Sequence, residues 1–195
     1  MGSELILREV QEGDLTTFFE QQLDPEAVRM AAVPSRTRAA FMLHWTKSMA
    51  VETSIFRTII FHGEVAGHIV YWEESGEGKI GYWLGKGYWG KGIATAALSL
   101  FLGFLKVRPL YARLAKHNIA SRRVLEKCGF TISGEDIFSE TDGKTCEDFI
   151  MRLGLNPCNE TPPQRPAAEP AAAPNGGPVM RSGNSRVSER PPSVS

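Results

Sequence analysis

Four glycines separate a predicted strand from a predicted helix, and their spacing suits the binding of an anion. They are Gly85, Gly87, Gly90 and Gly92. Because glycine has no Cβ atom, its backbone N–H group can come close to a ligand. The helix predicted to start at Ile93 begins with N–H groups that lack intrahelical partners, at its positive dipole end. The segment therefore predicts a phosphate or pyrophosphate site, although a tight strand-to-helix turn would also account for the glycines.

Two common nucleotide-binding patterns do not fit this segment. A P-loop ends in Gly-Lys-Ser/Thr, but here Gly90 and Lys91 are followed by Gly92, which has no hydroxyl group for magnesium. Gly85, Gly87 and Gly90 do match the pattern Gly-x-Gly-x-x-Gly. The acidic residue that a dinucleotide site needs about 20 positions later is, however, missing.

Other side chains that could do chemistry lie before and after the glycines. Asn118 and Ser121 have the spacing of a helix N-cap and the third helical residue. Glu73, Glu74 and Glu77 cluster near the end of a predicted strand, where a carboxylate could act as a general base or simply face solvent. The four histidines show no metal-ligand spacing, so we expect no metal site.

The composition divides the chain into a folded part and a tail. Nine of the twelve prolines lie from Pro157 onward, and no aromatic residue accompanies them. Such a segment buries too little apolar surface to offset its ordering entropy. We therefore expect one domain over residues 1–155 and a disordered tail over 156–195.

Charge and cysteine content exclude several classes of protein. The net charge is +0, which does not favour nucleic-acid or membrane partners. The apolar run from Ile93 to Leu105 is too short to span a bilayer, and the N-terminus lacks the regions of a signal peptide. Three cysteines without a Cys-x-x-Cys pair favour reduced thiols. We expect a cytoplasmic protein that is a monomer or a homodimer.

Hydrophobic periodicity and capping residues predict the elements that position these groups. Their order is strand, three helices, three strands, helix, strand, helix and two strands, which predicts a mixed α+β domain with a central, mainly antiparallel sheet. We expect Asp14 and Asn118 to cap the first and the last predicted helix, and Ser35 or Thr37 to precede the third. The second helix is predicted to have Pro25 at its first position, and the fourth to start at Ile93. The predicted strands cover Glu4–Glu9, Ile55–Phe61, Val65–Trp72, Lys79–Leu84, Pro109–Ala115, Phe130–Phe138 and Cys146–Leu153.

Two motifs at characteristic spacing resemble those of the GNAT N-acetyltransferases. The segments are IGYWLGKGYWGKGIATAAL and RPLYARLAKHNIASRRVLEKCGF, and LILREVQEGDL at the N-terminus is similar as well. Within the family, the chain is most similar to the RimJ/RimL-like branch. The resemblance covers residues 4 to about 153, all of the predicted folded part.

The resemblance implies that acetyl-CoA is the acyl donor and that its pyrophosphate lies on backbone N–H groups. In the family signature Gln/Arg-x-x-Gly-x-Gly/Ala, Trp89 stands where Gln or Arg is usual, and Lys91 becomes an extra cation. The resemblance also implies two splayed strands, with pantetheine on the exposed edge of the strand before the glycines and one N–H of that strand on the oxyanion. The cofactor-binding residues are then Tyr82, Trp83, Leu84, Trp89, Gly90, Lys91, Gly92, Ile93, Ala94, Thr95 and Asn118.

The resemblance assigns the acid more clearly than the base. It implies that Asn118 contacts the cofactor and that Ser121 faces the sulfur and protonates the departing thiolate. For the base we select Glu74, with Glu73 and Glu77 as alternatives, because Lys79 stands where related sequences often carry an acid. His44 and Trp45 could line the acceptor pocket or belong to an amphipathic helix face.

The expected function is the transfer of an acetyl group to a primary amine by direct attack. The acceptor would be a protein N-terminal α-amino group or a small-molecule amine. The alternative is a non-catalytic acyl-CoA-binding regulatory module that has lost its base.

Overall fold

The computed structural model describes residues 5–33, 35–139 and 145–154. Within these ranges the helices and strands follow the predicted order. One short 3-10 helix, η1 (Lys86–Tyr88), was not among the predicted elements. The predicted tail over 156–195 lies outside the described residues, so that the domain boundary stays a prediction.

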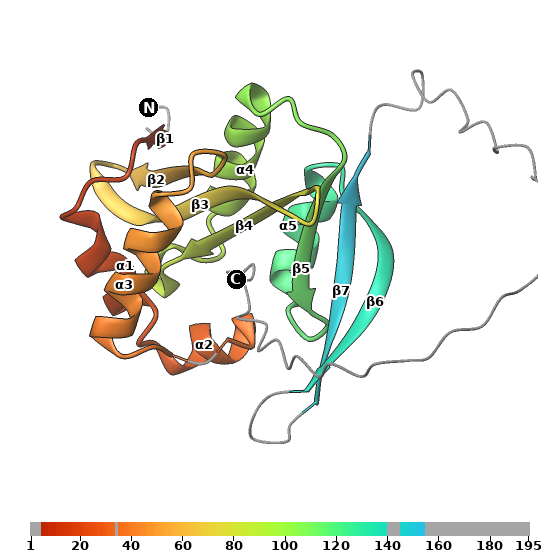
Figure 1. Ribbon diagram of the computed structural model, residues 1–195, viewed down its shortest axis with the longest axis horizontal. Helices are drawn as coiled ribbons and strands as arrows, with labels where there is room; N and C mark the ends of the chain where they lie inside the picture. The colour runs from red at the N-terminus through yellow and green to blue at the C-terminus, as the bar shows by residue number, and fades with distance from the viewer. Residues whose placement is uncertain (1–4, 34, 140–144, 155–195) are drawn as a thin grey trace, which may run out of the picture.

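A single seven-stranded sheet forms the centre of the domain, in the order β1-β2-β3-β4-β5-β7-β6 (Figure 1). All neighbouring strands run antiparallel except β4 and β5, which run parallel. This confirms the predicted α+β domain with a mainly antiparallel sheet. The strands are β1 (Leu5–Arg8), β2 (Ile55–Phe61), β3 (Glu64–Glu74), β4 (Glu77–Leu84), β5 (Leu110–Ala115), β6 (Thr131–Ser139) and β7 (Thr145–Leu153).

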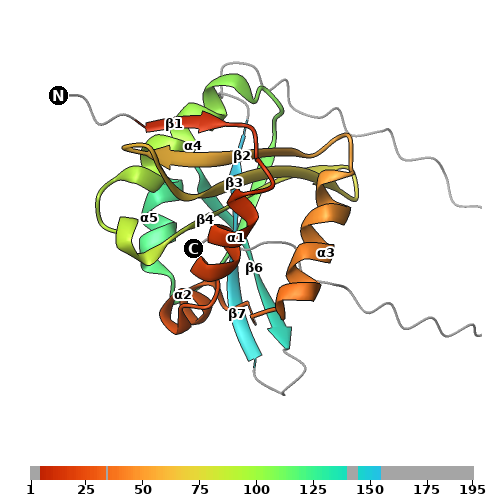
Figure 2. The same cartoon turned by 90° about the vertical axis from the view of Figure 1, so that its left-hand side faces the viewer.

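In the described part of the chain, five α-helices cover the two faces of this sheet (Figures 1 and 2). Helices α1, α2 and α3 lie on one face, and α4 and α5 lie on the other. No described helix is long and apolar enough to cross a membrane. The helices are α1 (Asp14–Gln21), α2 (Pro25–Ala31), α3 (Arg38–Met49), α4 (Ile93–Phe104) and α5 (Ile119–Lys127).

The main hydrophobic core lies between the sheet and the pair of helices α4 and α5. Because side chains alternate along a strand, β4 contributes Ile80, Tyr82 and Leu84 to this core. Trp83 points to the opposite face and packs against α2. Neighbouring residues of β4 thus pack against helices on opposite faces of the sheet.

The predicted cap of the first helix is wrong, whereas those of two other helices are confirmed. Thr37 caps α3 by accepting the Ala40 N–H at 3.3 Å, and Asn118 caps α5. Asp14 does not cap α1; it is the first residue of that helix, after Gly13.

The Asp14 carboxylate is instead the centre of a buried polar network. Both Asp14 oxygens accept hydrogen bonds from the Arg8 guanidinium, at 2.6 and 2.7 Å. The Gln11 N–H and the Thr58 hydroxyl also donate to Oδ2, at 2.9 and 2.7 Å. These four bonds join β1, α1 and β2, because Arg8 and Thr58 pair across the sheet.

His68 on β3 is buried on the face covered by α1 and α3. Its ring lies 4.7 Å from the Phe18 ring and 4.8 Å from the Trp45 ring, centroid to centroid. Trp45, which we considered for an acceptor pocket, is buried in this aromatic cluster. Burial, together with the smaller effect of the nearby His44, lowers the pKa of His68 to about 3.

The buried His68 is expected to make the domain less stable as the pH falls. A histidine with a lowered pKa in the folded state stabilises the fold above its unfolded pKa of about 6.5 and loses that contribution as the pH falls toward the folded pKa. From pH 7 to pH 5 this costs about 2 kcal/mol of unfolding free energy. Urea unfolding at both pH values measures it, and His68→Gln is expected to remove most of the difference.

The matched control for His68→Gln is His62→Asn. His62 is exposed in the β2–β3 turn with φ 51°, a conformation that asparagine tolerates. It is expected to keep the pH dependence of the wild type. Equal pH dependence in His68→Gln and the wild type would contradict the assignment to His68.

Candidate functional site

Strands β4 and β5 pair only at their beginnings and then diverge (Figure 1). The paired residues are Gly78 with Leu110 and Lys79 with Tyr111. Beyond them, β4 pairs only with β3, and β5 only with β7. The edge of β4 from residue 80 to residue 84 therefore has no β5 partner. This confirms the predicted splay, and it leaves the edge at Tyr82, Trp83 and Leu84 open to an extended ligand.

The glycine loop after β4 presents a row of unpaired backbone donors. Gly90 has φ 73° and Gly92 has φ 77°, and both conformations favour glycine. Gly92 is the N-cap of α4. The first N–H group that makes an intrahelical hydrogen bond is that of Ala96, which donates to the Gly92 carbonyl. Among the described residues, no hydrogen bond uses the N–H groups of residues 90 to 95. These donors fit an anion at a helix N-terminus.

The space in front of this loop is free of protein atoms where a side chain would point. A Cβ atom built on Gly87, Gly90 or Gly92 would meet no heavy atom within 4 Å. A phosphate group could therefore approach the N–H groups directly. The loop therefore has unpaired donors, of which Ile93, Ala94 and Thr95 supply the helical ones, and the phosphate site there stays a prediction.

Trp89 and Lys91 are both turned toward the loop itself. The Trp89 indole N–H donates to the Leu84 carbonyl at 2.8 Å, which ties the loop to the end of β4. Lys91 donates to the Gly87 carbonyl at 2.7 Å and lies 5.8 Å from the centroid of the Tyr88 ring. Trp89 thus has a structural role that its sequence position did not reveal.

Asn118 and Ser121 lie buried at the start of α5. The Asn118 side chain accepts the Ser121 N–H at 3.1 Å and donates to the Met30 carbonyl at 3.0 Å. His117 makes a second bond to α2, with the Arg29 carbonyl at 2.8 Å. Asn118 therefore caps α5 and joins α5 to α2, which fixes the position of Ser121.

Tyr82 on β4 carries a buried hydroxyl group on the side of the sheet that packs against α4 and α5. This hydroxyl has no hydrogen-bond partner among the described residues. Burial raises the pKa of Tyr82 well above its ordinary value, and the neighbouring Ser121 hydroxyl opposes that rise. On the other face, the buried Trp83 indole N–H is also without a partner in the described part of the chain.

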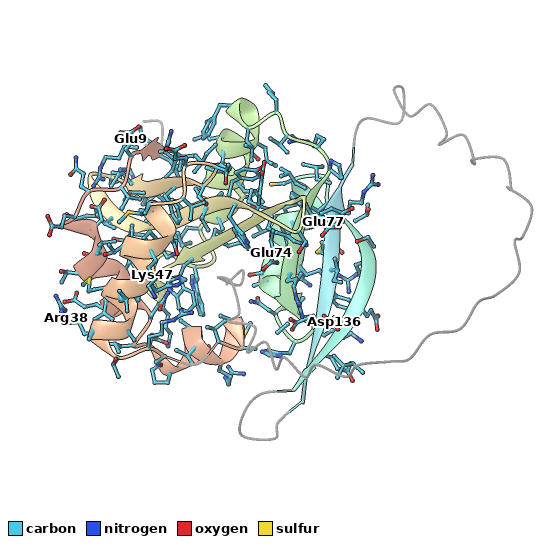
Figure 3. The ribbon with its side chains drawn as sticks, viewed as in Figure 1. Glu9, Arg38, Lys47, Glu74, Glu77 and Asp136 are labelled. Carbon is cyan, nitrogen blue, oxygen red and sulfur yellow. The ribbon has the colours of Figure 1, made fainter. Side chains whose placement is uncertain are left out.

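The structure places Glu74 far along the sheet from the end of β4. Glu74 is exposed and lies opposite Glu77 at the hairpin end of β3 and β4, where the turn is only Ser75 and Gly76 (Figure 3). Tyr82 lies five positions after Glu77, which is about 17 Å along a strand. Of the alternatives, Glu73 accepts a bond from Tyr71 at 2.9 Å, and Glu77 is ion-paired with Lys79.

The sequence analysis did not identify a cluster of three charged side chains on β5, β6 and β7. Asp148 on β7 is fully buried and lies opposite Asp136 on β6. The Arg113 guanidinium bridges the two carboxylates, at 3.2 Å from Asp148 and 3.0 Å from Asp136. The three partners come from three separate strands, so their proximity could not be predicted from the sequence. The only sequence signal for this cluster was the presence of charged residues within predicted strands.

The structure also has a cavity of about 600 Å³ away from these residues. It lies between the C-terminal halves of α4 and α5 and the end of β7, and Ser99, Lys106 and Cys128 are among its lining residues. None of the predicted site residues lines it. Among the described residues, no group of three or more His, Cys, Asp and Glu side chains could hold a metal ion.

Comparison with known proteins agrees with the predicted family. A model of the acetyltransferase (GNAT) domain matches residues 4–131. The chain is 36% identical over 85 residues to the Bacillus subtilis (strain 168) protein named "Probable N-acetyltransferase YjcK". That alignment covers 42% of this chain and 47% of the relative, so that the chain matches about half the length of this curated protein.

Solved structures of acetyltransferases share the fold. Spermidine N-acetyltransferase from Vibrio cholerae, solved with CoA and spermine, has a TM-score of 0.67 at 16% identity, over 77% of this chain and 95% of that one. RimL, a ribosomal L7/L12 alpha-N-protein acetyltransferase solved with coenzyme A, has a TM-score of 0.66 at 17% identity, over 80% and 96%. Since the family model matches more than half of the sequence and the fold agrees with it, the chain belongs to the acetyltransferase (GNAT) domain family.

Proposed function

We propose that the chain is an N-acetyltransferase that uses acetyl-CoA to acetylate a primary amine. The observation that carries this proposal is the row of unpaired N–H groups from residue 90 to residue 95, next to the open edge of β4. The two features suit the two ends of one ligand. The loop fits the pyrophosphate, and the strand edge fits the extended, amide-containing pantetheine chain, which can bond to a strand edge as an added strand does.

The residues of this chain have separate roles in the proposed reaction. The backbone from Gly90 to Thr95 holds the phosphates, and one N–H group of the edge formed by Tyr82, Trp83 and Leu84 donates to the oxyanion. Such a donor contributes about a hundred- to thousandfold in rate. Ser121, whose position Asn118 fixes, donates a proton to the departing sulfur. The amine attacks the thioester carbonyl directly, so that no acyl group is bound to the protein.

Glu74 enters this proposal as a base that acts at a distance. Its carboxylate and that of Glu77 are exposed at the hairpin end of β4, about 17 Å along the strand from Tyr82. At that separation they can attract a cationic amine and accept its proton through solvent, but they cannot touch the reacting carbonyl.

We propose that the acceptor is either a protein N-terminal α-amino group or a small amine. The first fits the RimJ/RimL-like branch, which the motif segments of this chain resemble most. The second is supported by the similarity of the fold to a spermidine N-acetyltransferase. A non-catalytic acyl-CoA-binding module is the rival function, because Lys79, at a position where related sequences often carry an acid, is ion-paired with Glu77.

Titration calorimetry with acetyl-CoA, followed by thiol-release assays, tests the proposal. The acceptors are spermidine, peptides with a free α-amino group and the same peptides with a blocked one. We expect binding, and turnover with at least one free amine but not with blocked peptides. Binding without turnover on any acceptor would favour the regulatory module. Absence of binding would refute both functions.

A further inference from the structure

The cavity between α4, α5 and β7 is lined by three cationic side chains and by no acidic one. Its volume of about 600 Å³ is typical of sites that bind small molecules. The cations are Lys106 and Arg108, just after α4, and Lys127, the last residue of α5. The other lining residues are uncharged, and Leu102 and Leu153 among them are apolar. The lining therefore suits an anion that also has an apolar part.

The three cations have no carboxylate partner among the described residues. Lys106 donates to the Gly103 carbonyl. Arg108 is partly buried, and its Nη1 donates to the carbonyls of Leu105 and Val107, at 3.0 and 2.6 Å. No hydrogen bond to the described residues uses its Nε or Nη2, so these two nitrogens can hold two oxygens of an anion.

Cations near helix ends have a simpler explanation, because they offset the partial negative charge of a helix C-terminus. Both α4 and α5 end at this cavity, and each C-terminus carries a charge of about −0.5. Together the two helices offset about one of the three positive charges. An excess of about two positive charges remains, which is the charge that a dianion neutralises.

Gly103 leaves a bare stretch of α4 on the wall of the cavity. Apart from proline, glycine is the least favourable residue within a helix. The φ angle of Gly103 is not positive, and a Cβ atom built on it would meet no heavy atom within 4 Å. Neither the backbone conformation nor packing against the described residues therefore requires a glycine here. Space for a ligand beside the helix would account for it.

The two cations after α4 lie at the opposite end of this helix from the glycine loop. The helix has 12 residues and is therefore about 18 Å long. Physiological salt screens exposed charges over about 8 Å, which is less than half of that length. Lys106 and Arg108 therefore cannot serve phosphates held at the loop, and the cavity is separate from the site proposed for acetyl-CoA.

We propose that this cavity binds a small organic dianion, either a phosphate monoester or a dicarboxylate. The anionic group lies among the three cations, with the Arg108 guanidinium as its bidentate donor, and the apolar part lies against Leu102 and Leu153. The inference goes beyond the proposed function and does not depend on it, because none of the residues assigned to the acetyl transfer lines the cavity.

Titration calorimetry on the full chain at fixed low salt, with and without saturating acetyl-CoA, tests this site. The probes are phenyl phosphate and phthalate, and phenol is the uncharged control. We expect at least one dianion to bind, and to bind at least about tenfold more tightly than phenol. The tighter dianion identifies the anionic group. Absence of binding by both dianions would overturn the inference, and so would displacement of the bound dianion by acetyl-CoA.

The variant Lys127→Gln locates the bound dianion, with Lys47→Gln as its matched control. Lys47 is also an exposed basic residue in the last turn of a helix, but it lies on α3 and outside the cavity (Figure 3). Both substitutions should change the melting temperature equally little, because each removes one cation from a helix end. Only Lys127→Gln is expected to weaken binding, by about tenfold. Equal affinities in the two variants would overturn the inference.

A third variant, Gly103→Leu, fills part of the cavity without changing its charge. It is expected to weaken binding at least about tenfold. The melting temperature should stay the same or rise, because leucine is a much better helix residue than glycine. Wild-type affinity in this variant would mean that no ligand lies against α4, contrary to the inference.

Discussion

Gly92→Glu is expected to abolish the binding of acetyl-CoA. Gly92 is the N-cap of α4, next to the unpaired N–H groups, and a Cβ atom built on it would meet no heavy atom within 4 Å. A glutamate would fill the place predicted for the phosphates and add a negative charge beside them. We expect the affinity to fall at least about a hundredfold, which is about 2.7 kcal/mol. Titration calorimetry at fixed salt concentration measures this change.

Gly92→Ala is the matched control, because it introduces the same backbone strain without the charge. Gly92 has φ 77°, a conformation that costs a non-glycine residue about 1–2 kcal/mol. Both variants are therefore expected to melt at similarly lowered temperatures, but the glutamate should weaken binding at least about ten times more than the alanine. If Gly92→Glu binds acetyl-CoA as tightly as the wild type, the phosphates do not lie on this loop.

Asp14→Asn is expected to have the largest effect on stability of the variants considered for this domain. The substitution keeps the shape of the side chain but removes the charge that the Arg8 guanidinium faces at 2.6 Å. The Asp14 side chain is 5% exposed, so solvent cannot replace the lost partner. Removing one member of a buried pair costs about 3–5 kcal/mol, and we expect about 3 kcal/mol because Arg8 is partly exposed. Urea unfolding at pH 7 measures the loss.

The matched control is Glu26→Gln, which breaks an exposed ion pair. Glu26 lies 2.6 Å from Lys86, and both side chains are about half exposed. Such pairs contribute about 0–1 kcal/mol, so this variant should be close to the wild type. Similar losses in the two variants would mean that burial does not determine the strength of the Arg8–Asp14 pair.

The Asp14 network also predicts how the loss depends on pH. Burial by itself raises the pKa of Asp14, but the hydrogen bonds from Arg8, Gln11 and Thr58 outweigh it and hold the pKa below its usual value. A carboxyl with a lowered pKa stabilises the fold above the unfolded pKa of about 3.9, and this contribution is lost as the pH falls through the folded value. The difference between Asp14→Asn and the wild type should therefore shrink below about pH 4.

Features that depend on neighbours in the sequence were predictable. The order of the elements follows from hydrophobic periodicity, and the Thr37 and Asn118 caps follow from residue type at a helix start. The glycine loop after β4 belongs to the same class, because its conformations at Gly90 and Gly92 are local properties of glycine.

Features that depend on distant partners were not predictable in the same way. Asp14 has the residue type of a helix cap, yet Arg8 and Thr58 engage its carboxylate, and Thr58 lies 44 positions away. Trp89 at the position of an expected Gln or Arg gave no hint of its bond to Leu84. Glu74 is near the site in the sequence, but the β3–β4 register carries it to the far end of the strand.

The sequence by itself determined that this chain has a strand, a glycine loop and a helix fit to hold a phosphate, and that its motifs resemble one family. Only the tertiary structure decided that β5 leaves β4 after Lys79, and that Asn118 joins the start of α5 to α2 and so fixes the position of Ser121. The physical reason is the range of the interactions involved. Backbone propensity and capping act within a few residues, whereas strand register and side-chain burial are fixed by packing between segments far apart in the chain.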